Sequence, residues 1–302
     1  MLRRAIRSAV SQNYNGKIEI IVVSDPPYYE EFEKAISAIK PDLKNNINVV
    51  HVKTPKPRSG PSTARNIGLQ NTSYDLVGFL DDDDEWLPNK LQLQLLYLRK
   101  HKLDVLLTSC LNLRNNICKR YPSTIKEKFK ILDKKDVVVH GLGLTSTALA
   151  YRSKLLEVGG FNENLRIGED IDIWLRLLDN GAKIGFLNIP TVIRHLHAGN
   201  ITMDSSIKAL NRALKFTLKF LPYYKDSMDI LSSKLYSLGK RSLRITPNTA
   251  EGLLRLAMTT GPLNIKLRII LFNIIRKALP REYALMTQNV LSNYYRTWIK
   301  KK

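Results

Sequence analysis

The sequence predicts an α/β fold with a mostly parallel central sheet flanked by helices, followed by a C-terminal helical region. Two observations carry this prediction. Up to about residue 200, short apolar runs rich in β-branched residues alternate with helical patterns, which is typical of parallel sheets whose strands are buried on both faces. Beyond residue 203 the pattern is helical, with breaks at prolines. We therefore expect an α/β domain over residues 1–203 and a basic helical region over residues 204–302.

The expected elements follow one another in a regular order. The strands are IEIIVV (18–23), INVVHV (47–52), YDLVGFL (74–80), LDVLLTS (103–109) and LTSTALAY (144–151), with further runs near 183–187 and 190–195. The helices are residues 28–40, 61–70, 86–100 and about 169–178. In the last helix, apolar residues at helical spacing, Trp174 among them, predict a buried face, and Gly181 is expected at its C-terminal cap.

The positive charge is concentrated in the last third of the chain. The net charge is +21, and residues 201–302 carry 19 basic and 5 acidic side chains, a surplus of 14. This balance predicts an anionic partner for that region, such as a membrane surface, a polyphosphate or a nucleic acid. A solvated basic face is the equally weighted alternative.

Cysteine content and hydropathy limit the class of protein. Cys110 and Cys118 provide neither a disulfide framework nor a zinc-ligand pattern, so we expect reduced thiols in a cytoplasmic protein. Arg3, Arg4 and Arg7 interrupt the apolar stretch near the start, and no signal peptide is expected there. The apolar run from Ile269 to Ile275 is too short to span a bilayer.

The most unusual stretch is FLDDDDEWLPNK (79–90), in which four aspartates follow an apolar run. Carboxylates at such close spacing repel one another unless a cation neutralises them. Oxygen ligands suit Mg²⁺ or Mn²⁺, which commonly share their coordination with substrate phosphates. One or two of these acids could simply favour the start of the next helix, expected near Trp86, but four in a row indicate a metal site.

The chain resembles the family 2 glycosyltransferases, which are inverting enzymes with the nucleotide-diphospho-sugar transferase fold called GT-A. Six segments occur in the family order within about the first 200 residues. They are LRRAIRSAVSQNY, IEIIVVSD, GPSTARNIGL, YDLVGFLDDDDEWLPNKLQLQ, VGGFNENLRIGEDIDIWLRL and HAGNIT. The resemblance implies transfer of a sugar from a nucleoside-diphosphate donor, UDP- or dTDP-linked, to an acceptor hydroxyl in surface polysaccharide, glycolipid or glycoprotein glycan synthesis.

The resemblance also implies roles for individual residues at the metal and donor. The family D-x-D motif falls on Asp81 and Asp83, so Asp83 is expected to ligate Mg²⁺ or Mn²⁺, with Asp81 at the metal or the donor ribose and Asp82 beside the donor. His197 matches a histidine that completes the metal site in some relatives, and a packed strand histidine is the alternative. Asp25 matches an acid that binds the nucleobase, although Ser24 replaces the acid that usually precedes it.

Further residues match the donor site and the catalytic base. Arg65 and Asn66 match the motif that flanks the nucleotide. Asp170 matches the catalytic base, and Glu169 is the alternative because an alignment shift of one residue exchanges the two. For Asp172 we prefer an interaction with the helix dipole.

Two other functions would each explain part of the sequence. A sugar-nucleotide pyrophosphorylase would need an N-terminal Gly-rich phosphate loop, which the sequence lacks. A basic nucleic-acid-binding protein would explain the charge, but no zinc-finger, RRM or helix-turn-helix signature accompanies it. We therefore expect no specific nucleic acid as a partner.

The two ends of the chain give two further expectations. Residues 262–302 mix apolar and basic side chains, as in an amphipathic helix at an anionic membrane surface, which would suit a lipid-linked or glycan acceptor. A helical subdomain or a dimer contact is the alternative. At the other end, relatives begin with a strand that lies between those matched here by 18–23 and 74–80. We expect a reading frame that begins upstream, or a poorly active fragment, with these two strands not directly hydrogen-bonded.

Overall fold

The computed structural model describes residues 1–25, 29–40, 43–165, 168–197, 216–217, 220–224, 227–242, 253–254 and 257. The chain divides into two compact units, Met1–Met203 and Asp204–Lys302, and each is considered by itself.

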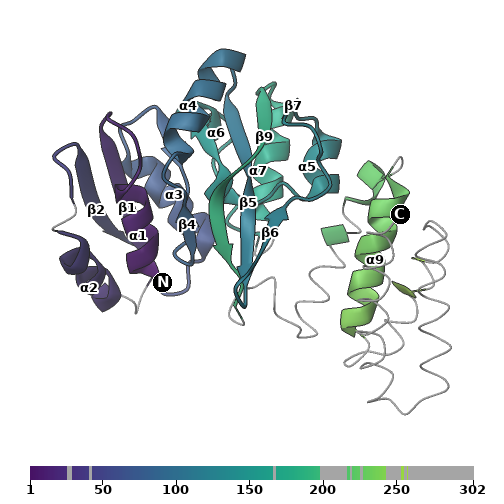
Figure 1. The fold of residues 1–302 in the computed structure, drawn as a ribbon, viewed down its shortest axis with the longest axis horizontal. Coiled ribbons are helices and arrows are strands. Elements are labelled where there is room, and N and C mark those ends of the chain that lie inside the picture. Colours follow the sequence, from purple (N-terminus) through teal and green to yellow (C-terminus); the bar gives the residue numbers. More distant parts are fainter. Residues whose placement is uncertain are drawn as a thin grey trace, which may run out of the picture. The chain divides into compact units, whose positions relative to one another are not determined.

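The first unit holds two sheets and the helices that pack on them (Figure 1). Its strands are β1 (Ile18–Ser24), β2 (Ile47–Lys53), β3 (Leu76–Gly78), β4 (Asp84–Trp86), β5 (Val105–Arg114), β6 (Ile117–Tyr121), β7 (Phe129–Ile131), β8 (Leu149–Tyr151) and β9 (Ile184–His195). Its helices are α1 (Leu2–Val10), α2 (Tyr29–Ile39), α3 (Pro61–Asn71), α4 (Lys90–His101), α5 (Lys134–His140), the 3-10 turn η2 (Thr145–Thr147), α6 (Arg152–Glu157) and α7 (Glu169–Asp179).

The large sheet is mixed, which corrects the expectation of a mostly parallel sheet. Its order is β3-β8-β5-β9-β4, with β6 on β5 and β7 on β9. In this sheet only β5 and β9 pair in parallel, because β8 runs antiparallel between β3 and β5. Strands β3, β5 and β9 nevertheless point the same way, so the aspartate run follows the carboxyl end of β3, where ligands bind in open α/β sheets.

Strands β1 and β2 pair in parallel in a sheet of their own. Strand β3 pairs with β8 in the large sheet, so β1 and β3 are not hydrogen-bonded to each other. The sequence predicts that these two strands are not directly hydrogen-bonded, and pairing of β1 with β3 would have contradicted that prediction. The upstream strand itself stays a prediction.

Three predicted elements differ from the structure. Of the strand expected at 144–151, residues 145–147 form the 3-10 turn η2 and only 149–151 form a strand, β8. The helix expected from Trp86 begins at Lys90, because residues 84–86 form an edge strand on β9. The two runs expected near 183–187 and 190–195 are one strand, β9. Pro190 cannot donate a ladder hydrogen bond, and the β5–β9 register shifts there, where Ser109 lies opposite Pro190.

The core packs the helices against both sheets. Ile6 and Val10 of α1 pack with Ala35 and Ile39 of α2. On its other side, α1 reaches the large sheet through Ala9, which clusters with Trp86, Cys110 and Val192. Trp174 is fully buried in α7, and Gly181 follows this helix with φ +80°, as the sequence predicted. Helix α1 therefore connects the two sheets directly beneath the aspartate run.

The second unit contains η4 (Leu221–Tyr224) and α9 (Met228–Ser242). The expected membrane helix within 262–302 lies outside the described residues. No helix in the described part of the chain combines the length and apolar character that crossing a bilayer requires.

Candidate active site

The four aspartates have different environments. Asp82 is exposed, Asp81 and Asp83 are half-buried, and Asp84, the first residue of β4, is only 2% exposed. Burial, with repulsion from Asp81 and Asp83, raises the pKa of Asp84 to about 7. Partial desolvation and repulsion from Asp83 and Asp81 also raise the pKa of Asp82. Asp81 and Asp83 are thus the members of the run that are accessible and also held by partners from other elements.

Asp83 faces a histidine from the end of β9. Nε2 of His197 lies 3.2 Å from Oδ2 of Asp83, and two residues earlier Nε2 of His195 lies 3.3 Å from Oε2 of Glu85. The period of two in an extended chain places both rings on one side. Of the two histidines, His197 is the one that lies beside the expected metal ligand.

Arg65 of α3 joins the aspartate run to helix α7. Its Nη2 donates to Oδ1 of Asp81 at 2.8 Å, and its Nη1 donates to Oε1 of Glu169 at 3.1 Å. The guanidinium carbon lies 5.4 Å from the centre of the Phe161 ring. The arginine side chain is only 12% exposed, so two carboxylates from distant parts of the sequence share one buried cation.

Asp170 is adjacent to Glu169 but has different contacts. Its Oδ1 accepts the backbone N–H of Ile171 at 2.8 Å, and no ion pair within 4 Å holds it among the described residues. Its carboxylate packs on Gly143, where an added Cβ would come within 2.4 Å of Oδ2. Desolvation, followed by repulsion from Glu169, raises the pKa of Asp170 above its usual range. A carboxylate in this environment suits a general base better than the ion-paired Glu169.

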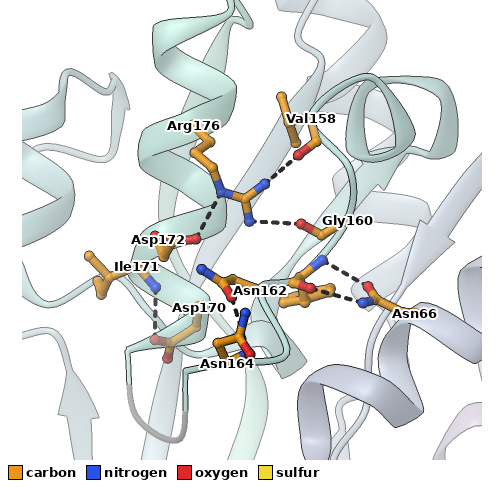
Figure 2. A network of polar contacts seen from close by, with 10 residues as sticks. Asn66, Val158, Gly160, Asn162, Asn164, Asp170, Ile171, Asp172 and Arg176 are labelled. Atoms are coloured by element: carbon orange, nitrogen blue, oxygen red, sulfur yellow. Dashed lines mark hydrogen bonds and ion pairs between the residues drawn. The ribbon is translucent and has the colours of Figure 1, made fainter.

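Helix α7 is fixed to the loop that precedes it by Arg176 (Figure 2). The guanidinium donates to Oδ2 of Asp172 at 2.8 Å and to the carbonyls of Val158 and Gly160. Asp172 is thus occupied by an ion pair within its own helix, and its expected interaction with the helix dipole stays a prediction. These contacts set the position of the first turn of α7, which carries Asp170.

Asn66 holds the same loop from the side of α3 (Figure 2). Its Oδ1 accepts the N–H of Phe161, and its Nδ2 donates to the Phe161 carbonyl and to Glu163, each at 2.8 Å. Both amide hydrogens are used by the protein, so the geometry favours a supporting role for Asn66. Its assignment to donor binding rests on the resemblance.

Asp25 lies at the end of β1. Its oxygens accept the Thr54 hydroxyl at 3.0 Å and the Gly60 N–H at 3.2 Å. Partial burial opposes ionisation, yet these hydrogen bonds hold the pKa of Asp25 below its usual value. A carboxylate that stays ionised retains lone pairs for a further donor, such as a nucleobase N–H.

The donor set fits a divalent cation that shares its coordination with a diphosphate. No three His, Cys, Asp or Glu side chains of the described residues gather closely enough to hold a metal by themselves. Mg²⁺ characteristically uses one or two carboxylates and completes its sphere with phosphates and water. The Asp83 carboxylate beside His197, with Asp81 close in sequence, supplies such a partial set.

The structure therefore brings together Asp81, Asp83 and His197 on one side and Glu169 on the other, through Arg65. The hydrogen-bond partners of Asp25, Thr54 and Gly60, lie outside this group. Sequence reasoning missed Gly143 and Ser146, because neither lies in a recognisable motif and their roles depend on tertiary packing. It also missed Arg4, whose Nη2 donates to the carbonyl of Asp83 at 2.8 Å.

An α/β fold with an acidic turn after a strand is the arrangement expected of a nucleotide-sugar transferase. Residues 1–159 match the model of glycosyl transferase family 2, and the chain belongs to that family. The match covers the aspartate run and ends shortly before Glu169 and Asp170.

Relatives from several bacteria share this similarity. The chain is 25% identical over 269 residues to WcaA of Escherichia coli (strain K12), a candidate colanic acid biosynthesis glycosyl transferase, covering 83% of this chain and 87% of WcaA. It is 24% identical over 205 residues to the amylovoran biosynthesis glycosyltransferase AmsE of Erwinia amylovora, covering 66% and 71%. A Campylobacter jejuni GalNAc(5)-diNAcBac-PP-undecaprenol beta-1,3-glucosyltransferase is 25% identical over 177 residues, covering 59% and 55%.

Solved structures confirm the predicted GT-A fold class. S. aureus TarS 1–349 in complex with UDP-GlcNAc superposes with a TM-score of 0.58 at 16% identity, covering 98% of this chain and 88% of that chain. The same protein in complex with UDP gives a TM-score of 0.56, covering 87% and 78%.

Proposed function

We propose that this glycosyltransferase moves a sugar from a nucleoside-diphosphate sugar to an acceptor hydroxyl, with inversion at the anomeric carbon and with Mg²⁺ or Mn²⁺ bound at Asp83. The observation that carries the proposal is the Arg65 bridge between Asp81 and Glu169. It ties the acidic turn that would receive the donor to the helix that carries Asp170.

In this reaction Asp170 acts as the general base. Its raised pKa lets it take the proton of the acceptor hydroxyl as that oxygen attacks the anomeric carbon. The bond from this carbon to the diphosphate oxygen breaks in the same step, and the nucleoside diphosphate leaves with that electron pair. One displacement at one carbon inverts its configuration and needs no protein nucleophile.

The remaining residues hold the donor and orient the site. Asp83 and His197 would hold the cation, whose positive charge stabilises the charge that develops on the leaving diphosphate. Arg65 keeps Asp81 and Glu169 in place, and Asp25 is positioned to accept a hydrogen bond from the nucleobase. The TarS complexes contain UDP and UDP-GlcNAc, which favours a UDP-sugar as the first donor to test.

The relatives indicate the class of acceptor. The Campylobacter jejuni relative is named for an undecaprenol-linked glycan, and two others are named for colanic acid and amylovoran biosynthesis. We therefore propose a lipid-linked or polysaccharide acceptor, met at the membrane surface. The basic C-terminal region would provide peripheral attachment to anionic lipid.

A panel of nucleotide sugars tests this proposal. We expect release of the nucleoside diphosphate from one donor in Mn²⁺ or Mg²⁺, and its loss in EDTA. Asp83→Ala should abolish turnover while the protein stays folded, and NMR of the product should show the inverted anomer. Full turnover in chelator would exclude the metal role, and retained configuration would exclude the single displacement.

A further inference from the structure

The 3-10 turn η2 lies against the aspartate run and is held there by buried hydrogen bonds. Ser146, the middle residue of η2, is fully buried. Its hydroxyl oxygen accepts the backbone N–H of Asp81 at 3.2 Å, and the backbone N–H of Asp84 donates to the Asp81 carbonyl at 3.0 Å. The Ser146 hydroxyl therefore holds the first aspartate of a turn that a backbone hydrogen bond closes at the last aspartate.

The backbone around Ser146 is held by the segment that follows the aspartates. Three consecutive carbonyls accept hydrogen bonds from side chains spaced four residues apart. Trp86 Nε1 donates to the Ser146 carbonyl at 3.0 Å, Gln94 Nε2 to that of Thr147 at 2.9 Å, and Lys90 Nζ to that of Ala148 at 3.1 Å. Because all six residues are at most 8% exposed, water cannot readily replace these bonds, and η2 has little freedom to move.

Helix α1 and the residues just after it also hydrogen-bond the segment that follows the aspartates. Ser8 accepts the N–H of Trp86 at 3.0 Å, and Gln12 donates to the Leu87 carbonyl at 2.9 Å. Trp86 and Leu87 are thereby fixed from two directions. At the start of the turn, the Ser146 hydroxyl accepts the backbone N–H of Asp81.

We propose that Ser146 is a positioning residue for the transfer reaction, which holds the Asp81–Asp84 turn in the conformation that binds the divalent cation and the diphosphate. This inference rests on the proposed function. Ser146 does not itself touch the cation or the donor. It acts through the backbone of Asp81, and its removal should loosen the turn that also carries Asp83.

Such supporting hydrogen bonds have measurable effects. Loss of a group that orients a metal ligand typically lowers metal affinity or activity by about 10- to 100-fold. Ser146→Ala should therefore raise the Mn²⁺ concentration for half-maximal binding by at least about tenfold.

Thr147→Val is the matched control. Thr147 lies in the same turn and is also buried, at 4% exposure, but its hydroxyl donates locally to the Leu144 carbonyl at 2.7 Å. This variant removes a hydroxyl and its hydrogen bond from η2 without touching the aspartates. It should keep the Mn²⁺ affinity within about threefold of wild type, because the hydrogen bonds that hold the aspartates stay intact.

The experiment is a calorimetric titration of Mn²⁺ into the full chain saturated with UDP, with thermal unfolding followed in parallel. Ser146→Cys serves as a second variant, in case the alanine variant fails to fold, because its slightly larger thiol leaves no cavity and is a weaker hydrogen-bond acceptor. A weakened Mn²⁺ affinity in the Ser146 variants alone supports the proposal. Equal affinity in wild type and Ser146→Cys, or equal losses in Ser146→Cys and Thr147→Val, would overturn it. If wild type binds no Mn²⁺ with UDP, the metal role in the proposed function fails first and this inference falls with it.

Discussion

Nη2 of Arg65 lies 2.8 Å from Oδ1 of Asp81, and this ion pair connects helix α3 to the acidic turn after β3. The same guanidinium reaches Glu169, and its two carboxylate partners raise its pKa further above the ordinary value, although burial alone would lower it. The charge of Arg65 is therefore fixed, and it offsets the repulsion between two acids that the fold brings together.

Replacing Arg65 by lysine tests this connection. A compact ammonium lacks the fork that donates to two carboxylates at once, so we expect kcat to fall by at least about tenfold, equivalent to about 1.4 kcal/mol in the activation barrier. Arg65→Ala should also lower the free energy of unfolding by about 3 kcal/mol, since both acids lose a buried partner. Chemical denaturation and steady-state kinetics measure the two effects.

The control for Arg65 is an exposed ion pair in the same unit. Lys134 pairs with Asp179 at the surface, with side chains 39% and 59% exposed. Lys134→Met should change the free energy of unfolding by less than about 1 kcal/mol and leave kcat unchanged. Wild-type kinetics in Arg65→Lys would show that the bridge has no part in catalysis.

Substitutions of the adjacent acids Glu169 and Asp170 should have clearly different effects on the transfer rate. Asp170→Asn should lower the transfer rate by about 10²- to 10⁴-fold while UDP binding stays near wild type. Glu169→Gln keeps an oxygen that can accept from Arg65, so a much smaller loss is expected. The reverse ranking would move the catalytic base to Glu169.

The pH dependence of transfer gives an independent check on Asp170. A general base must be deprotonated, and the pKa of Asp170 is raised. Activity should therefore increase with pH through the raised pKa, and the acid limb of the kcat/KM profile should lie above about pH 4, where an ordinary aspartate titrates. A rate that is flat down to that pH would contradict the assignment of Asp170.

Local patterns and tertiary contacts explain what the sequence could and could not predict. Helix α7 was predicted within one residue of its end, because its apolar spacing, acidic first turn and Gly181 all act locally. Strand β4 was missed, since three residues at a sheet edge are specified by pairing with β9, more than 100 residues away. The site shows the same division: Asp83 and Asp170 lie in motifs, whereas Ser146 and Gly143 acquire their roles only when residues 143–147 pack against Asp81 and Asp170.

Gly143 should tolerate no side chain if Asp170 is the base. A Cβ at Gly143 would come within 2.4 Å of Oδ2 of Asp170, so Gly143→Ala must displace that carboxylate. A misplacement of about 1 Å can cost about 10²-fold in rate. We expect a fall of that order in kcat, with the KM for the donor nearly unchanged.

Gly68→Ala is the matched control for Gly143→Ala. Gly68 lies in α3, and the nearest atom to its added Cβ is Val23 Cγ2 at 3.8 Å, an ordinary contact. This variant should keep wild-type kcat and gain about 0.5–1 kcal/mol of stability, because alanine favours a helix over glycine. Equal kcat in the two variants would indicate that Gly143 has no special relation to the base.

Lys90 provides a test of the buried network beneath the site. Its side chain is completely buried, its Nζ contacts Gln94 and the Ala148 carbonyl, and burial lowers the pKa of Lys90 to about 7. Below pH 7 the folded protein must bury a charged ammonium, and this cost disappears as pH rises from 7 toward 10.5, the pKa in the unfolded chain. Wild type should therefore gain stability relative to Lys90→Met across that window, by at most about 5 kcal/mol for a shift of this size.

Urea unfolding of both proteins at pH 7, 8.5 and 10 measures the difference, in which groups shared by the two proteins cancel. A difference that stays constant with pH would show that Lys90 is charged in the folded state throughout, and that the carbonyl of Ala148 and the Gln94 amide solvate an ammonium ion.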